Sequence, residues 1–127
     1  MRFMMLVKAT RESEAGIPPS AELMAAVTKL AEDATARGAL LMAGGLFPSS
    51  EGVRISVKGG KSAVTDGPFA ETKELVGGFA IFELGSKEEA VESGREFMQL
   101  HADILGPSYE GELEIRPLFD PHAQSAE

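Results

Sequence analysis

The sequence contains no cysteine, tryptophan or asparagine and only two histidines. Without cysteine the chain cannot form disulfides, thiolate metal sites, iron–sulfur clusters or a cysteine nucleophile. The histidines, His101 and His122, do not repeat the spacing of a metal-binding motif, so we expect no metal and no other cofactor. The motifs of phosphate-binding loops, dinucleotide-binding folds, serine hydrolases and zinc proteases are also missing. Most chemistry that short motifs can reveal is therefore excluded.

Long hydrophobic runs and an excess of basic charge are lacking too. No apolar run approaches the roughly 18 residues of a membrane span, and the apolar start is too short for a signal peptide, so we expect a cytoplasmic protein without a membrane partner. The net charge of -8 argues against direct contact with nucleic acid, which requires clustered Lys and Arg. Residues 83–127 carry eleven acidic and three basic side chains. This excess indicates either a solvated helix face or a docking surface for a basic protein.

The length of 127 residues predicts a single domain. The hydrophobic content of 43% and the charged content of 25% are those of an ordinary soluble globular protein, so the chain can build a core without disulfides or metals. We assign residues 1–120 to the domain and residues 121–127 to a flexible tail.

The order of apolar periodicities predicts two similar strand–helix–strand units. Ser20 can cap a first helix that ends at Gly38, and the capping box from Ser86 to Glu89 opens a second helix that ends at Gly106. The expected strands cover residues 2–8, 39–46, 53–58, 61–65, 77–84 and 112–119, and those at 53–58 and 61–65 form a hairpin with one polar face. This order matches a ferredoxin-like α+β sandwich with an inserted β-hairpin.

Two of the strands, residues 2–8 and 77–84, are apolar on both sides, which indicates central positions in the sheet. Two helices can cover only one face of a four-stranded sheet. Either the Phe3/Met5 side or the Met4/Leu6 side would therefore stay exposed in a monomer, and packing against a second copy is the simplest way to cover it. The sequence thus predicts an obligate homodimer.

The densest motif is the polar loop at residues 66–74, which follows the hairpin. Gly67 before Pro68 is pushed out of the helical region, and Phe69 can anchor the loop in apolar surroundings. Asp66 is the candidate general base, if burial raises its pKa. The same loop could equally be a structural buttress for the next strand and the dimer seam.

Further candidates surround this loop. Arg54 and Lys73 could contact an anionic ligand, Glu71 could add a polar contact, and Phe69 could form a wall of the site. Arg54 and Lys73 could also be ordinary surface cations. His101 is a weaker ligand-binding candidate, because a single histidine on the apolar stripe of a helix is usually packed and hydrogen-bonded near the C-terminal turn.

Several segments together resemble the DGPF branch of the YCII-related domain family. They are the start Met1-Arg2-Phe3-Met4-Met5-Leu6-Val7-Lys8, the turn Gly45-Leu46-Phe47-Pro48-Ser49, the motif Asp66-Gly67-Pro68-Phe69-Ala70-Glu71-Thr72-Lys73-Glu74 with Gly77-Gly78-Phe79, and the end Glu114-Ile115-Arg116-Pro117. The resemblance implies a ferredoxin-like fold and a dimeric α/β barrel, in which two sheets face each other across a cleft.

The resemblance implies little about the reaction. It is compatible with a small-molecule binding site, or a weak acid/base catalytic site, in the cleft between the sheets. Because DGPF proteins are often encoded beside alternative sigma factors, it is also compatible with a non-catalytic regulatory module that binds a sigma factor. A dimeric scaffold without a ligand is the third possibility. Whether the protein is an enzyme is left open.

Overall fold

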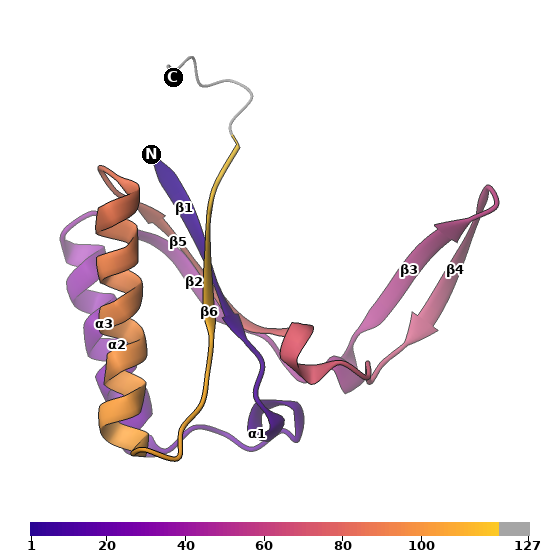
Figure 1. Cartoon of the computed structure of the whole chain (residues 1–127), viewed down its shortest axis with the longest axis horizontal. Helices are drawn as coiled ribbons and strands as arrows, with labels where there is room; N and C mark the ends of the chain where they lie inside the picture. The colour runs from indigo at the N-terminus through magenta and orange to yellow at the C-terminus, as the bar shows by residue number, and fades with distance from the viewer. Residues whose placement is uncertain (120–127) are drawn as a thin grey trace.

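The computed structural model describes residues 1–119, apart from the side chain of Lys73. Its main sheet is antiparallel and has the order β2 (Leu40–Gly45), β5 (Val76–Glu83), β1 (Arg2–Lys8) and β6 (Leu113–Pro117) (Figure 1). The two strands predicted to be central, β1 and β5, are the central ones. The architecture is α+β and is consistent with a ferredoxin-like fold. The tail predicted at residues 121–127 lies outside the described residues.

The two long helices, α2 (Ala21–Ala36) and α3 (Lys87–Leu105), begin where the capping residues predicted. The Ser20 hydroxyl accepts a hydrogen bond from the Leu23 amide at 3.2 Å, and the Ser86 hydroxyl accepts one from the Glu89 amide, also at 3.2 Å. The capping box is shifted by one residue from the prediction, since the Glu89 carboxylate accepts from the Gly85 amide at 3.0 Å. The chain leaves α2 through Gly38, whose φ is 77°.

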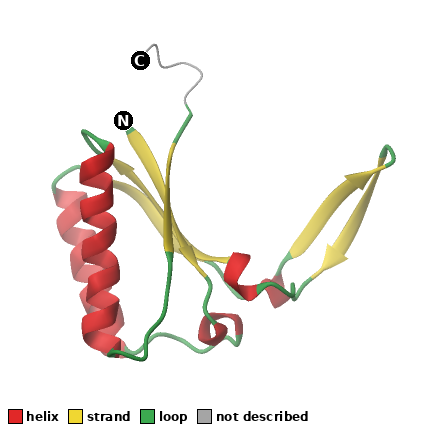
Figure 2. Ribbon diagram, viewed as in Figure 1, coloured by secondary structure: helices red, strands yellow, loops and turns green. Residues whose placement is uncertain are grey.

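Both long helices lie on the same side of the main sheet (Figure 2). On this side the core forms around Phe3, Met5 and Ala90, which are at most 3% exposed. Partly buried apolar side chains from β5, β6 and the chain just after β5 complete it, namely Ala80, Phe82, Leu84, Leu113 and Ile115. The helices thus cover the Phe3/Met5 side of β1 and leave its Met4/Leu6 side to the other face.

That other face, which we call the open face, is apolar across both central strands. Met4 is paired with Ile81 and Leu6 with Phe79, and directly paired residues project from the same face of a sheet. Met42, which is paired with Ile81, continues the row onto β2 and is 57% exposed. The prediction that β1 and β5 are apolar on both faces is confirmed.

Two segments differ from the sequence prediction. The sequence predicts no helix before Ser20, but α1 (Arg11–Glu14) forms there, capped by reciprocal hydrogen bonds between Thr10 and Ser13. The hairpin consists of β3 (Val53–Lys58) and β4 (Lys61–Asp66), so Asp66 ends a strand and does not begin the loop. These two strands form a separate sheet and make no pairing with the main one.

Candidate functional site

The hairpin of β3 and β4 projects from the end of the main sheet as an arm, on the side away from the long helices (Figures 1 and 2). All of its residues are exposed. Its strands pair regularly, so that one face carries Val53, Ile55, Val57 and Val64, with Ser62 towards the tip and Asp66 at the base, and the other carries Arg54, Ser56, Lys58, Lys61, Ala63 and Thr65. The predicted polar face is confirmed. The opposite, apolar face is uncovered within the chain.

The base of the arm is held by a chain of hydrogen bonds centred on Ser49. The Ser49 amide and hydroxyl both donate to the Glu14 carboxylate, at 2.9 and 2.6 Å. The Ser49 hydroxyl in turn accepts from the Phe69 amide at 3.0 Å. These bonds join α1, the short 3₁₀ helix η1 (Ser49–Glu51) and the loop after β4. The arm therefore leaves the body from a defined junction.

Gly67 lies at the closest approach of this junction. Its amide donates to the Gly52 carbonyl at 2.9 Å, which joins the two ends of the arm. A Cβ atom at position 67 would overlap the Ser49 carbonyl group and lie 2.7 Å from its carbon. Only glycine fits against this backbone. The glycine of the Asp66-Gly67-Pro68-Phe69 motif thus has a packing role at the arm base.

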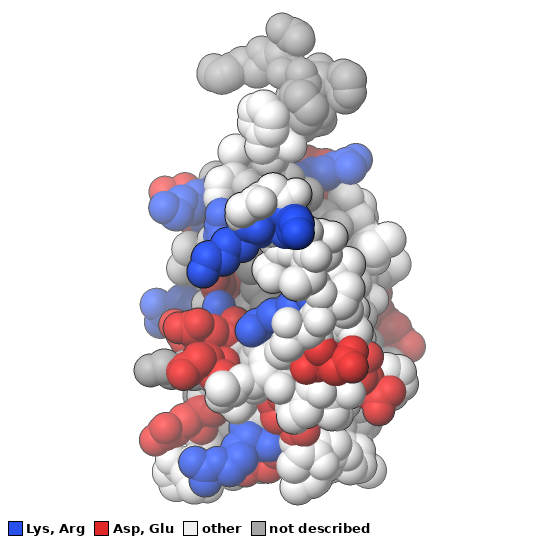
Figure 3. Space-filling view, turned by 90° about the vertical axis from the view of Figure 1, so that its right-hand side faces the viewer, with Lys and Arg blue, Asp and Glu red and all other residues white. Residues whose placement is uncertain are grey.

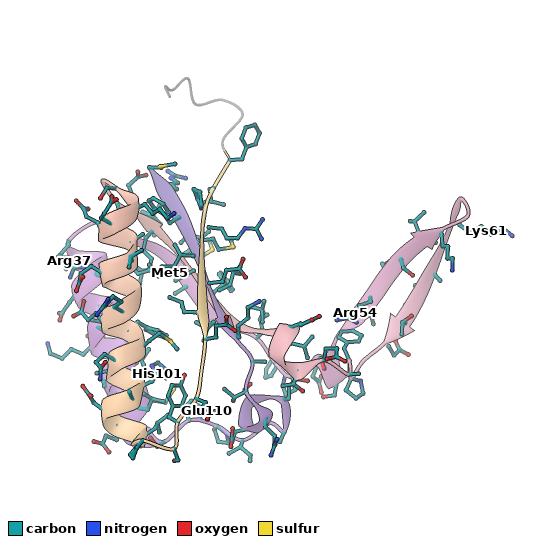
Figure 4. All side chains as sticks on the ribbon, in the orientation of Figure 1. Met5, Arg37, Arg54, Lys61, His101 and Glu110 are labelled. Atoms are coloured by element: carbon teal, nitrogen blue, oxygen red, sulfur yellow. The ribbon has the colours of Figure 1, made fainter. Side chains whose placement is uncertain are left out.

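Arg54 and Phe69 are brought together. The guanidinium carbon of Arg54 lies 3.9 Å from the centre of the Phe69 ring, a cation–π arrangement. Phe69 is partly buried, and its position is fixed by the hydrogen bond to Ser49. In Figure 4, Arg54 lies at the base of the arm and Lys61 at its tip. The predicted aromatic wall and one predicted anion contact are therefore neighbours.

The other candidates from the loop lie near this pair in sequence. Asp66 is exposed and is paired with Val53 at the end of β4. Glu71 is also exposed, and its backbone carbonyl accepts from the Glu74 amide at 2.9 Å as the chain enters the 3₁₀ helix η2 (Thr72–Glu74). Lys73 lies within η2. The backbone therefore gathers these positions along one connection between the arm and β5.

His101 is not part of this cluster. It lies on α3, among the helices, whereas Arg54 lies on the arm (Figure 4). Its Nδ1 donates to the Phe97 carbonyl at 2.9 Å, and its ring packs between Phe97 and Tyr109 with centroid distances of 4.5 and 5.6 Å. Burial raises the pKa of Tyr109. The geometry of His101 is that of a packed helix residue.

A cavity of about 480 Å³ lies between the helices and the sheet. Part of its floor is made of small residues, because Ala43 is paired with Ala80 and Gly45 with Gly78 on the neighbouring strands β2 and β5. Larger side chains of the sheet line the rest of the floor, among them Met5, Val7 and Phe82. Apolar side chains of α2 and α3 form the other walls, among them Met24, Val27, Leu30 and Phe97. The sequence alone did not predict this cavity.

One ion pair, Lys29–Asp33, lies on α2, and the other ion pairs among residues 1–119 lie at the periphery of the main sheet. Glu83 is contacted by the Met1 ammonium at 2.6 Å and by Arg2 at 3.1 Å, and these hydrogen bonds lower the pKa of its carboxyl group. Glu114 on β6 is 3.3 Å from Lys8 and 3.5 Å from Arg116. These charges border the open face and leave its centre apolar.

Within residues 1–119, no three histidine, aspartate or glutamate side chains gather closely enough to hold a metal ion. The same residues include no helix of the length and hydropathy that crossing a membrane requires. Glu14 and Ser49, which fix the arm base, were not anticipated from the sequence. The capping pattern of Thr10 and Ser13 could have revealed α1, but no sequence signal brings Ser49 to Phe69.

The fold is that of a small α+β protein with one long hairpin that projects from the body and forms its own sheet. The pattern of the YCII-related domain family matches residues 1–103, a range that includes the arm and its base. The chain belongs to this family. An uncharacterised protein of Rhizobium meliloti (strain 1021) is 35% identical over 73 residues, which is 58% of this chain and 54% of that protein. The alignment thus spans about half of the relative's length.

Proposed function

We propose that this protein is a homodimeric small-molecule-binding protein of the DGPF branch, in which two open faces pack against each other as a dimeric α/β barrel. The observation that carries the proposal is the row Met42, Ile81 and Met4 with its neighbours Leu6 and Phe79 on the face of the sheet away from both long helices (Figure 2). Met42 is 57% exposed, and the other four are partly exposed. Burying apolar area contributes about 25 cal/mol per Å². Face-to-face packing of sheets, about 10 Å apart, is the common way to bury such a surface.

The ligand site belongs in the cleft between the two sheets, near the base of the arm. Arg54 over Phe69 supplies a cation beside an aromatic wall, and Asp66 ends the adjacent strand β4 on the face of the hairpin opposite to Arg54, so the proposed ligand lies across the base of the arm. With Glu71 and Lys73, this set offers both charges to a small polar ligand. Because Asp66 is exposed within one chain, the general-base role requires that the second copy bury it, whereas an exposed Asp66 can still anchor a ligand. The site therefore serves slow proton transfer in the first case and binding alone in the second.

Two variants decide between the cleft and the cavity under the helices. Stabilising metabolites are first found by thermal shift with the purified wild-type protein, because a bound ligand raises the melting temperature. Asp66→Ala should abolish the shift while the variant keeps its fold and its dimeric state. Ala43→Leu, which adds bulk to the floor of the cavity, should leave the shift unchanged. The opposite pattern would assign the ligand to the helix–sheet cavity and refute the cleft.

The sigma-factor module is the second candidate, favoured by the exposed acidic side chains Glu88, Glu92 and Glu96 on α3. It predicts salt-sensitive binding of a basic protein surface to this helix. The test is a pull-down with a sigma factor encoded beside the gene, using wild type and a triple Glu→Lys variant at these positions. Binding that is unchanged by the charge reversal would exclude the acidic face of α3.

A further inference from the structure

We propose that the arm is a clamp: in the dimer, the β3–β4 hairpin of each copy packs its apolar face on the body of the other copy. This inference rests on the proposed homodimer and adds the surface that holds the two copies together. The partner on which the apolar face of the arm packs is a second copy of this chain and not a different protein.

The first argument is the exposure of the apolar face of the arm. Val53, Ile55, Val57 and Val64 are 57%, 69%, 74% and 66% exposed. β-branched residues at alternating positions are typical of a strand with one buried side. A two-stranded hairpin alone is at best marginally stable in water, and this arm makes no pairing with the main sheet. The regular arm therefore requires a covering surface outside its own chain.

The second argument is the junction that positions the arm. The hydrogen bonds of Ser49 to Glu14 and Phe69, together with the packing of Gly67 on the Ser49 backbone, fix the direction in which the arm leaves. The arm and the open face lie on the same side of the molecule, away from the helices (Figure 1). A second copy seated on the open face is therefore adjacent to the arm.

The third argument is charge. Residues 53–66 carry three basic side chains and one acidic side chain, a net charge of +2, and since the whole chain carries -8, the rest carries -10. The view from the arm side shows charges of both signs separated by broad uncharged surface (Figure 3). The three cations project from the polar face of the arm, opposite the apolar face that packs, so this charge favours the approach of a basic arm to an acidic body and does not act within the apolar contact.

The fourth argument is size. Four strands about 4.8 Å apart and about six residues long give the open face a footprint of roughly 400 Å². Standard interfaces bury about 800 Å² on each partner. The arm enlarges the contact twice in a symmetric dimer, because each copy both inserts its own arm and receives the arm of the other.

The absence of cysteine from the sequence permits a direct test with single-cysteine variants. Val57→Cys places a thiol on the apolar face of the arm, and Ser56→Cys places one on the neighbouring polar face as the matched control. In the dimer, we expect iodoacetamide to modify the thiol at position 57 at least tenfold more slowly than the thiol at position 56. On dilution to monomer the two rates should become equal. Equal rates at every concentration would overturn the proposal.

An armless variant gives the second measurement. The hydrogen bond between the Gly67 amide and the Gly52 carbonyl shows that the ends of the arm meet, so an Asn-Gly turn can replace residues 53–66. Removing the clamp should raise the dimer dissociation constant, measured by sedimentation, about a hundredfold or more while the circular dichroism of the body is retained. An armless dimer as tight as wild type refutes the clamp and leaves the dimer standing. A wild-type monomer at micromolar concentration refutes both.

Discussion

Gly67→Ala is the most direct test of how the arm is attached. The added Cβ would lie 2.7 Å from the Ser49 carbonyl carbon and 3.2 Å from the Gly52 oxygen, and the shorter contact is inside the 3.0 Å limit that real Cβ atoms keep. Both neighbours are backbone atoms, so no flexible side chain can relieve the overlap. The backbone has to separate at this point, which opens the arm base.

The cost follows from the hydrogen bonds at the same contact. Separation breaks the bond from the Gly67 amide to Gly52 and weakens that from the Gly52 amide to Ser49, both 2.9 Å long. At about 1 kcal/mol each, local opening becomes easier by about 2 kcal/mol. This corresponds to roughly thirtyfold faster amide exchange at the arm base. Amides of β1 and β5 should keep their wild-type protection, because the arm does not pair with them.

Gly52→Ala is the matched control, because it adds the same methyl group at the other end of the arm. There the new Cβ would lie 3.5 Å from the Ser49 oxygen and 3.8 Å from the Phe69 ring, ordinary van der Waals distances. We expect wild-type exchange at the arm base in this variant. If Gly67→Ala exchanges like wild type, or if the two variants behave alike, close packing at position 67 does not hold the arm.

Three further predictions concern the body and the arm. Phe3→Ala should lower the free energy of unfolding by about 3–5 kcal/mol in chemical denaturation, since Phe3 is 1% exposed. Met4→Ala should act mainly on the dissociation constant of the proposed dimer. Similar losses of unfolding free energy in both variants would contradict the assignment of the two faces. Glu83→Gln should lower the melting temperature at neutral pH, because the pKa of Glu83 in the folded protein lies below its ordinary value of 4.5. The stabilisation by the ionised carboxylate is complete above pH 4.5 and is lost as the pH falls through the folded pKa, so the melting temperatures of variant and wild type should converge at low pH. A difference in melting temperature that does not change with pH would disprove this linkage. Arg54→Met should remove the cation–π contact, which contributes about 0.5–1 kcal/mol. Loss of the contact should shift the amide resonance of Phe69 in the NMR spectrum. An unchanged resonance would show that the guanidinium does not pack on the ring.

The arrangement of the main sheet could be predicted because it follows from two simple kinds of sequence signal, the residues that cap helices and the apolar or polar character of each side of a strand. Ser20, Ser86, Gly38 and Gly106 mark helix ends through their own side chains or backbone freedom. The two-sided apolar pattern of residues 2–8 then fixed a central position, since an edge strand has one polar or solvated side. The sequence could not predict which face of β1 the helices cover, because the Phe3/Met5 side and the Met4/Leu6 side are equally apolar. Only the position of the helices in the structure distinguishes them.

The geometry of the candidate site was harder to predict from the sequence, because it depends on contacts between distant parts of the chain. Ser49 contacts Glu14 and Phe69 across 35 and 20 positions of sequence, and no short motif encodes such a meeting. Arg54 and Phe69 were named separately, and their stacking follows only once the hairpin returns the chain to its base. His101 could be assigned its packing role in advance, because its partner Phe97 lies one turn away on the same helix.

The arm shows why the apolar/polar alternation of a sequence does not by itself predict which molecule covers the apolar side. Alternation of Val53, Ile55 and Val57 with polar residues indicates that one side of the hairpin is covered, and a strand on its own core or on a partner has the same alternation. What separates the two cases is position: the hairpin forms its own sheet and stays exposed on both sides within the chain. An intramolecular pattern without an intramolecular partner points to a second molecule. The alkylation rate of a cysteine introduced at position 57, compared with one introduced at position 56, measures whether that molecule is another copy.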